Sequence, residues 1–208
     1  MLKITQSLIS AWDYWNSSAD ETRDEAYASF LAKLRREPSP DNVKTANGHF
    51  FEDAIRAEVE GKPFPSWLLR QKGMEEGVTT ISSMLHGATF QAHLFRRFTV
   101  GSHEMLLHGV ADAIKAGTIY DFKLKTKSFH STYLPGSYIN SSQHPAYFFA
   151  MPEAREFVYL VSDGCDLYTE RYIPSEVTPF PVIATEFIGS LKALGLFDTY
   201  RKHWEVEG

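Results

Sequence analysis

The sequence predicts an α/β fold in which a mixed central sheet is flanked by helices. Segments with helical periodicity alternate along the chain with segments of alternating apolar and polar residues, which is typical of this class. Of the 208 residues, 43% are hydrophobic and 14% aromatic, enough for a packed core. The length is that of one domain. We therefore expect a single domain over residues 1–208, with a core at about 44–173 and peripheral helices at 4–36 and 180–205.

The first part of the chain is predicted to be mostly helical. Thr5 can cap the first helix, Pro38 and Pro40 stop the second, and Gly61 ends the third. The predicted helices cover residues 5–15, 20–36, 44–60 and 76–85.

The second part is predicted to be mostly strands. A helix capped by Ser141 or Ser142 interrupts them and ends near Ala150, and a C-terminal helical region is broken near Gly195. The predicted elements are a strand at 91–100, a hairpin at 104–125, the helix to 150, a second hairpin at 155–162 and 167–173, and helical residues 182–204.

The hairpin at 104–125 carries the most informative pair of side chains. A turn of two or of four residues around Ala116-Gly117 sets Asp112 directly opposite Asp121, whereas a three-residue turn does not. Like charges opposed across two strands are destabilising. A cation between the two carboxylates relieves the repulsion, and oxygen ligands of this kind suit Mg²⁺ or Mn²⁺.

Lys123 lies two residues after Asp121, so the strand places both on one face. Two carboxylates and an ammonium beside a divalent metal can cleave a phosphodiester. The metal polarises the phosphate and lowers the pKa of a bound water, and the lysine orients that water or offsets the charge of the transition state. Lys125 and Lys127 add positive charge beside this site, where we expect nucleic acid to bind. The alternative for Asp112 is a surface position or an ion pair with Lys123.

Composition excludes several other classes of protein. A single cysteine, Cys165, rules out an internal disulfide and a four-cysteine zinc or iron–sulfur site, and a reduced, cytoplasmic location is the simplest expectation. We find no secretion signal, membrane-length apolar run, phosphate-binding P-loop or nucleophile elbow. The net charge of −5 argues against nonspecific DNA binding, so local positive charge matters more.

Gly109-Val-Ala-Asp112 followed by Asp121-Phe-Lys123 resembles the signature of the PD-(D/E)XK nuclease superfamily. Other stretches resemble its RecB-like and phage exonuclease branch, and together the similarity spans about residues 4–162. These are the opening helix Ile4–Trp15, a helix motif with an acid four residues after a glycine at Gly48–Glu52, and a Q-x-x-x-Y motif at Gln143–Tyr147.

The resemblance implies a restriction-endonuclease-like core and a role for each matching residue. Asp112 and Asp121 would be the metal carboxylates, and the Phe122 carbonyl a further ligand. Lys123 would be the catalytic lysine. Glu52 would bind or orient the metal and its water, and its alternative is a solvated position on an acidic helix.

Gln143 and Tyr147 lie four residues apart, so they share one helix face. In the family this face lies near the scissile phosphate and the DNA strand. Their alternative is a helix N-terminus and a tyrosine at the edge of the core. His49 and His144 are close in sequence to site residues, and His49 could reach the same pocket. The alternative for both is an ordinary exposed or hydrogen-bonded histidine.

These observations predict a metal-dependent DNA nuclease. The Q-x-x-x-Y motif favours an exonuclease acting on linear double-stranded DNA or single-stranded ends, in phage or bacterial recombination, repair or DNA processing. A recombination protein or a helicase is the expected partner. The alternatives are a non-catalytic nucleic-acid-binding or scaffold protein on the same fold, and a site-specific endonuclease.

Overall fold

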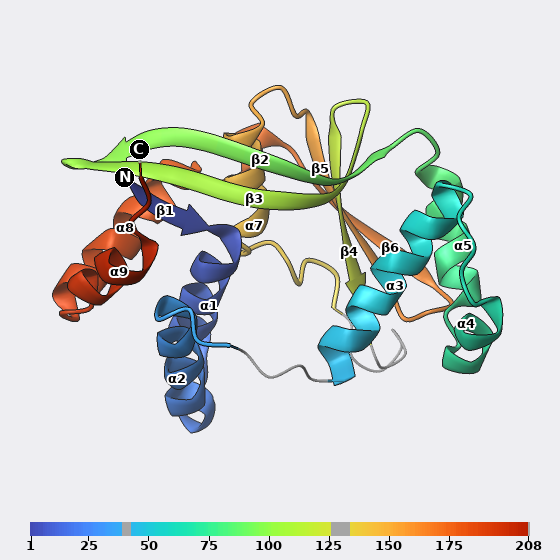
Figure 1. Cartoon of the computed structure of the whole chain (residues 1–208), viewed down its shortest axis with the longest axis horizontal. Helices are drawn as coiled ribbons and strands as arrows, with labels where there is room; N and C mark the ends of the chain where they lie inside the picture. Colours follow the sequence, from blue (N-terminus) through green and yellow to red (C-terminus); the bar gives the residue numbers. More distant parts are fainter. Residues whose placement is uncertain (39–42, 126–133, 208) are drawn as a thin grey trace.

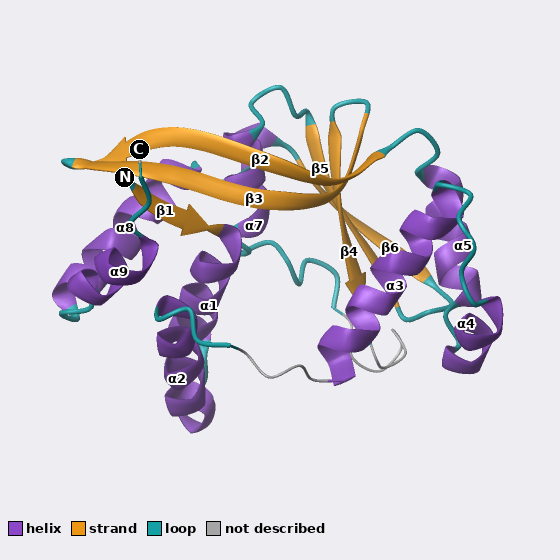
Figure 2. Cartoon of the chain, in the orientation of Figure 1, coloured by secondary structure: helices purple, strands orange, loops and turns teal. Residues whose placement is uncertain are grey.

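The computed structural model describes residues 1–38, 43–125 and 134–207, and it confirms the predicted α/β fold. A six-stranded mixed sheet is flanked by helices, the arrangement of a restriction-endonuclease-like core (Figures 1 and 2). The strands run in the order β1-β3-β4-β5-β6, and β2 pairs with β3. The strands are β1 (Leu2–Thr5), β2 (Thr89–Val100), β3 (His103–Lys115), β4 (Thr118–Leu124), β5 (Glu156–Ser162) and β6 (Leu167–Tyr172).

Every helix predicted from the sequence is present, with boundaries that differ by a few residues. The α-helices are α1 (Gln6–Ser17), α2 (Arg23–Leu34), α3 (Val43–Val59), α4 (Ser66–Lys72), α5 (Glu75–Met84), α7 (Gln143–Ala150), α8 (Phe180–Ala193) and α9 (Phe197–Trp204). Two 3₁₀ turns, η1 (Asp20–Thr22) and η2 (Pro174–Glu176), accompany them. Thr5 caps α1 as predicted, since its hydroxyl accepts from the Leu8 amide at 3.3 Å.

Strand β3 organises the sheet because three strands pair with it. Antiparallel β2 follows one edge along nearly its whole length. On the other edge, parallel β1 pairs with Met105–His108 and antiparallel β4 pairs with Ala113–Lys115. Between these two, residues 109–112 pair with no strand of the described chain on that edge. In this gap, side chains take the place of a paired strand. The Asp112 carboxylate accepts from the Phe122 amide of β4, and the Tyr147 hydroxyl donates to the Val110 carbonyl of β3.

The β3–β4 connection is the predicted two-residue turn. Lys115 pairs with Thr118, and Ala116 and Gly117 have φ of 50° and 81°. Positive φ at both central residues is what a type I′ turn requires. The register is therefore the one that sets Asp112 opposite Asp121.

The sheet buries apolar side chains on both faces. One cluster joins β1 and β3 to α1, α2, α8 and α9, a second lies between the sheet and α3–α5, and a third lies beside α7. The inner strand β4 reaches two of them, since Phe122 belongs to the second cluster and Ile119 to the third. Asp121 is therefore only 5% exposed, although its strand face is partly polar.

Two elements, β1 and α4, are absent from the sequence-based prediction. β1 has four residues and is held by parallel pairing with a strand about a hundred residues away, which no local pattern reveals. The seven residues of α4 are too few to show a helical period. Among the described residues, no single helix is long and apolar enough to cross a membrane; α8 and α9 pass that test only as a pair, bent by 117°.

Candidate active site

Asp112 lies at a break in the strand ladder. The register of β3 and β4, continued one step past the Ala113–Tyr120 pair, sets Asp112 opposite Asp121. In place of a regular ladder bond, Oδ2 of Asp112 accepts from the Phe122 amide at 2.9 Å. On the other edge, the register of β2 sets Gln91 opposite Asp112, and Gln91 has a φ of 50°. A left-handed, non-glycine residue beside a half-buried carboxylate marks local strain of the kind found at functional sites.

Asp121 is held by contacts to both of its oxygens. Nζ of Lys123 lies 2.6 Å from Oδ2 in an ion pair. Nε2 of Gln143, from α7, donates to Oδ1. Oδ2 is buried and has no hydrogen-bond partner beyond the charge of Lys123. The carboxylate is thus fixed from β4 and from α7, with Lys123 as its counterion.

The pKa shifts show that three carboxylates from three elements influence one another. Burial, then the charges of Asp121 and Glu52, raise the pKa of Asp112 well above its usual range. Burial, then Asp121, raise the pKa of Glu52 on α3, and His49 and Lys123 partly oppose this. Glu52 is therefore brought close enough to Asp121 and Asp112 to sense their charges.

Lys123 keeps its proton in this environment. Burial lowers the pKa of its ammonium, but Asp121 and Asp112 outweigh burial, so the net pKa is raised. The ammonium also lies 5.9 Å from the centre of the Tyr159 ring. At neutral pH Lys123 is thus a fixed positive charge rather than a base.

Neutralising Asp112 should stabilise the protein in the absence of metal. Because the folded pKa of Asp112 is raised, ionisation costs stability, and this cost appears as pH rises through the folded pKa. Asp112→Asn keeps an oxygen for the Phe122 amide and removes the charge. We expect a higher melting temperature at neutral pH, a difference that disappears toward acid pH, and loss of any Mn²⁺-induced shift. An unchanged or lower melting temperature at neutral pH would contradict this electrostatic assignment.

Tyr147 fills the gap in the sheet beside Asp112. It is 5% exposed, and its hydroxyl donates to the Val110 carbonyl, which lacks a strand partner on that edge. A Cβ added to Gly109 would lie 2.9 Å from the Tyr147 ring. Gly109 is therefore small because an aromatic ring packs directly on the backbone of β3.

Gly109→Ala should destabilise the protein by about 1–3 kcal/mol, since it overpacks a well-filled site. The Tyr147 ring would have to move, because the added Cβ lies 2.9 Å from its Cε1 and 3.3 Å from its Cζ. Gly48→Ala is the matched control: a Cβ there meets nothing within 4 Å, and alanine is the better helix former. Thermal unfolding of both variants tests this. Equal melting temperatures would mean that Gly109 is not needed for close packing.

The other predicted site residues have different neighbours. Lys125 follows β4, with Nζ 5.3 Å from the centre of the Tyr138 ring, and Lys127 lies outside the described residues. His49 is exposed, three residues before Glu52. His144 is buried, its Nδ1 is 3.1 Å from the Tyr159 hydroxyl, and burial lowers its pKa to about 4. The functional roles of all these residues remain predictions.

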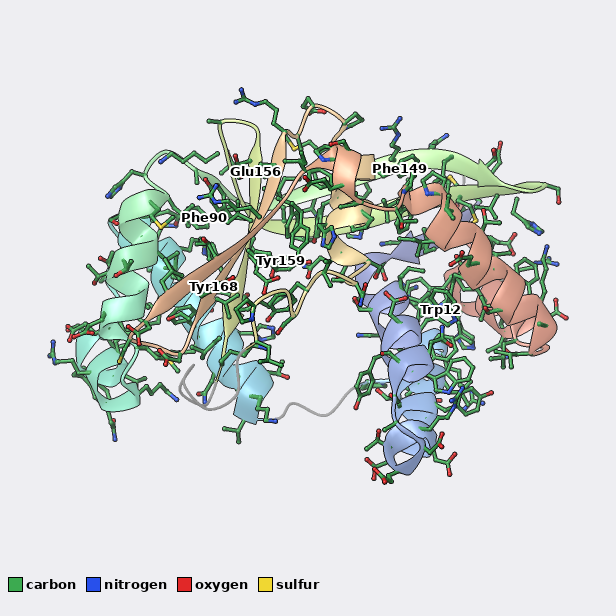
Figure 3. All side chains as sticks on the ribbon, turned by 180° about the vertical axis from the view of Figure 1, so that it is seen from behind. Trp12, Phe90, Phe149, Glu156, Tyr159 and Tyr168 are labelled. Atoms are coloured by element: carbon green, nitrogen blue, oxygen red, sulfur yellow. The ribbon has the colours of Figure 1, made fainter. Side chains whose placement is uncertain are left out.

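Tyr159 is a residue of this site that the sequence did not single out. Parallel pairing of β4 with β5 sets Tyr159 directly beside Asp121. It is fully buried, near the centre of the molecule in Figure 3, and burial and Asp121 raise its pKa. Its strand reads as an ordinary apolar core strand, so only the pairing of β5 with β4 reveals its place.

The side chains at this centre are of the kind that binds a divalent cation, but they are not arranged as a complete coordination shell. Among residues 1–38, 43–125 and 134–207, no three His, Cys, Asp or Glu side chains are grouped closely enough to hold a metal. Lys123 occupies the space beside Oδ2 of Asp121. That buried, otherwise unbonded oxygen and the mutually repelling Asp112 and Glu52 are the donor set that Mg²⁺ or Mn²⁺ prefers.

The fold is similar to solved structures at low sequence identity. LHK-Exo in complex with dAMP aligns with a TM-score of 0.53 and 12% identity, over 96% of this chain and 92% of that one. SSO0001 aligns with a TM-score of 0.48 and 13% identity, over 93% of this chain and 78% of that one. No protein-family model and no curated protein matches the sequence. The chain therefore shares its overall fold with LHK-Exo.

Proposed function

We propose that this protein is a metal-dependent DNA nuclease, and more specifically an exonuclease. The observation that carries the proposal is that Asp112, Asp121 and Glu52, from three separate elements, lie near enough to influence one another's charge, with the ammonium of Lys123 paired to Asp121. Like charges held near one another cost stability, and perturbed carboxylates of this kind cluster at functional sites. The match in fold to LHK-Exo, crystallised with dAMP, supports the same assignment.

Asp112, Asp121, Glu52 and the Phe122 carbonyl are the residues that would hold Mg²⁺ or Mn²⁺. When bound, the cation would polarise the scissile phosphate and lower the pKa of the attacking water. Gln143 orients Asp121 through its hydrogen bond to Oδ1. Tyr147 fixes the β3 backbone two residues before Asp112. These contacts hold the carboxylates in place without help from the substrate.

Lys123 supplies positive charge to the hydrolysis. The water oxygen forms a bond to phosphorus, the ester phosphorus–oxygen bond breaks, and the leaving oxygen takes up a proton. Negative charge on the phosphoryl oxygens rises during this exchange. A protonated amine within the site offsets that charge, as its raised pKa allows.

Linear DNA is the substrate class that we propose, with double-stranded or single-stranded ends. The proposed setting is phage or bacterial recombination, repair or DNA processing in the cytoplasm, with a recombination protein or helicase as partner. The match to LHK-Exo favours an exonuclease over a site-specific endonuclease. A non-catalytic nucleic-acid-binding protein is disfavoured because Asp112, Asp121 and Lys123 are all present.

A cleavage assay with two DNA topologies tests the function. We expect Mn²⁺ or Mg²⁺ to support nucleotide release from linear DNA, with closed circular DNA of the same sequence left intact. Glu52→Gln should lose activity, whereas Asp53→Asn should retain it, because Asp53 is an exposed neighbour paired with Arg56. Cleavage of the circle would indicate an endonuclease. If neither substrate were cleaved with metal present, the remaining assignment would be a non-catalytic nucleic-acid-binding protein.

A further inference from the structure

A cluster of three aromatic rings lies outside the proposed active site, on the β2–β3 hairpin. The rings of His93 and Phe95 on β2 and His108 on β3 are parallel to within 16°. Ring centres are 4.5 Å apart for Phe95 and His108 and 5.4 Å apart for His93 and His108. Nδ1 of His93 and Nε2 of His108 lie 3.1 Å apart, so one ring donates to the other. We call these three residues the ring platform.

The ring platform is not part of the core. Phe95 is 55% exposed, and His93 is also exposed. The core side chains of β2 lie on its opposite face, where Phe98 contacts Phe149 of α7, which Figure 3 shows beside this hairpin. Figure 1 shows α7 behind the same two strands. The rings therefore stand on the face of the hairpin that α7 and α8 do not cover.

Positive charge borders the ring platform. The register sets Lys3, Leu106 and Arg97 side by side in one row across β1, β3 and β2. The next row holds His108 and Phe95, two residues or about 7 Å farther along the strands. Burial, then the charge of Lys3, lower the pKa of His108, so Lys3 is close to this ring. Two cations thus stand one row away from the rings.

A hollow lies beside the ring platform, with His108 in its lining. It has a volume of about 350 Å³ and is open to solvent. Its lining includes His108, Gly109 and Val110 of β3, Tyr147 of α7 and the first residues of α1. His108 and Asp112 are four residues apart on β3, or about 13 Å along the strand. The hollow therefore adjoins the β3 segment that leads from the ring platform toward Asp112.

We propose that the ring platform stacks the unpaired bases of a single-stranded nucleic acid whose backbone passes through the hollow to the active site. Exposed rings beside positive charge are what single-strand-binding surfaces use, since every base has a face to stack and every nucleotide a phosphate to neutralise. Bases within a duplex have no free faces, so the occupant is a single strand. This inference rests on the proposed nuclease function and assigns the surface that would receive the unpaired end.

A second copy of this chain is the competing occupant, because exposed aromatic rings also mediate protein association. Positive charge on the bordering row favours nucleic acid, since two copies meeting at this face would bring like charges together.

Binding of a labelled oligothymidylate, measured by fluorescence anisotropy in EDTA, tests the proposal without any cleavage. Phe95→Ala should weaken binding about fivefold or more, the loss expected for one stacked base. Phe95→Leu, which keeps an apolar side chain without a π-face, should lose nearly as much. For an abasic oligonucleotide of the same length, wild type and the Phe95 variants should have the same affinity. Trp67→Ala, at another exposed aromatic residue, is the control and should bind like wild type.

Several outcomes would overturn the inference. These are no measurable wild-type binding, unchanged binding by Phe95→Ala, or an equal loss on the abasic oligonucleotide. Sedimentation of the same proteins identifies the competing occupant, since a wild-type dimer that Phe95→Ala separates without affecting DNA binding would assign the ring platform to a second copy. The cleavage assay with Mn²⁺ is independent. A protein that stacks bases and never cleaves would refute the nuclease function and leave the ring platform intact.

Discussion

Lys123→Ala is expected to slow cleavage of linear DNA by a factor of about 10²–10³, the loss typical of removing one group that stabilises charge in a transition state. The ammonium sits 2.6 Å from Asp121 and is held protonated by Asp121 and Asp112. Lys123→Arg keeps a charge with a different shape, so it should recover only part of the activity. Lys192→Ala, at an exposed lysine of α8, is the control for loss of positive charge.

The stability of the same variant should depend on metal. Without metal, Lys123→Ala leaves a buried carboxylate without its counterion, which costs about 1–3 kcal/mol. A divalent cation beside Asp121 would replace the lost charge, so added Mn²⁺ should raise the melting temperature of the variant more than that of wild type. Wild-type cleavage rates in folded Lys123→Ala protein would rule out the assigned role.

Tyr147→Ala is expected to lower stability by about 3–5 kcal/mol, as for other large aromatic side chains removed from a core. For a chain of this length that is a fall of about 6–20 °C in melting temperature. The ring is 5% exposed and packs on Gly109. Tyr147→Phe keeps the ring and leaves the Val110 carbonyl without its donor, at a cost of about 1–3 kcal/mol. Tyr14→Ala, at an exposed tyrosine, should change stability little.

Cleavage rates of these variants, measured below their melting temperatures, separate two roles for Tyr147. If the residue positions β3, cleavage and stability fall together, and Tyr147→Phe retains most activity. If it contacts the DNA strand, as the family resemblance implies, Tyr147→Ala loses activity beyond what its stability explains. Gln143→Ala should slow cleavage with a small effect on melting, because it removes one donor from Asp121. Full activity in both alanine variants would refute either role.

The elements that the sequence predicted well are those with strong local signals. The Ala116-Gly117 turn and the alternation on either side of it sufficed to predict the register that brings Asp112 toward Asp121, because a hairpin is a local structure. The caps and proline stops placed the longer helices within a few residues. The two aspartates and Lys123 could be named together for the same reason.

The parts that the sequence did not reveal depend on long-range pairing. Tyr159 joins the site only because β5 lies parallel to β4, and no pattern within β5 indicates its neighbour. The burial of Tyr147 follows from the gap on β3 between β1 and β4, which requires the unpredicted strand β1. The left-handed conformation of Gln91 opposite Asp112 likewise has no sequence signal, since glutamine rarely adopts it.

A crystal structure after soaking with Mn²⁺ tests the central claim most directly. The account predicts an anomalous density peak between Asp112 and Asp121, about 2.0–2.3 Å from carboxylate oxygens of both, with Glu52 turned toward it. Nζ of Lys123, now 2.6 Å from Asp121, should have moved off that oxygen. An intact Lys123–Asp121 ion pair with no peak between the aspartates, at a metal concentration that supports cleavage in solution, would contradict it.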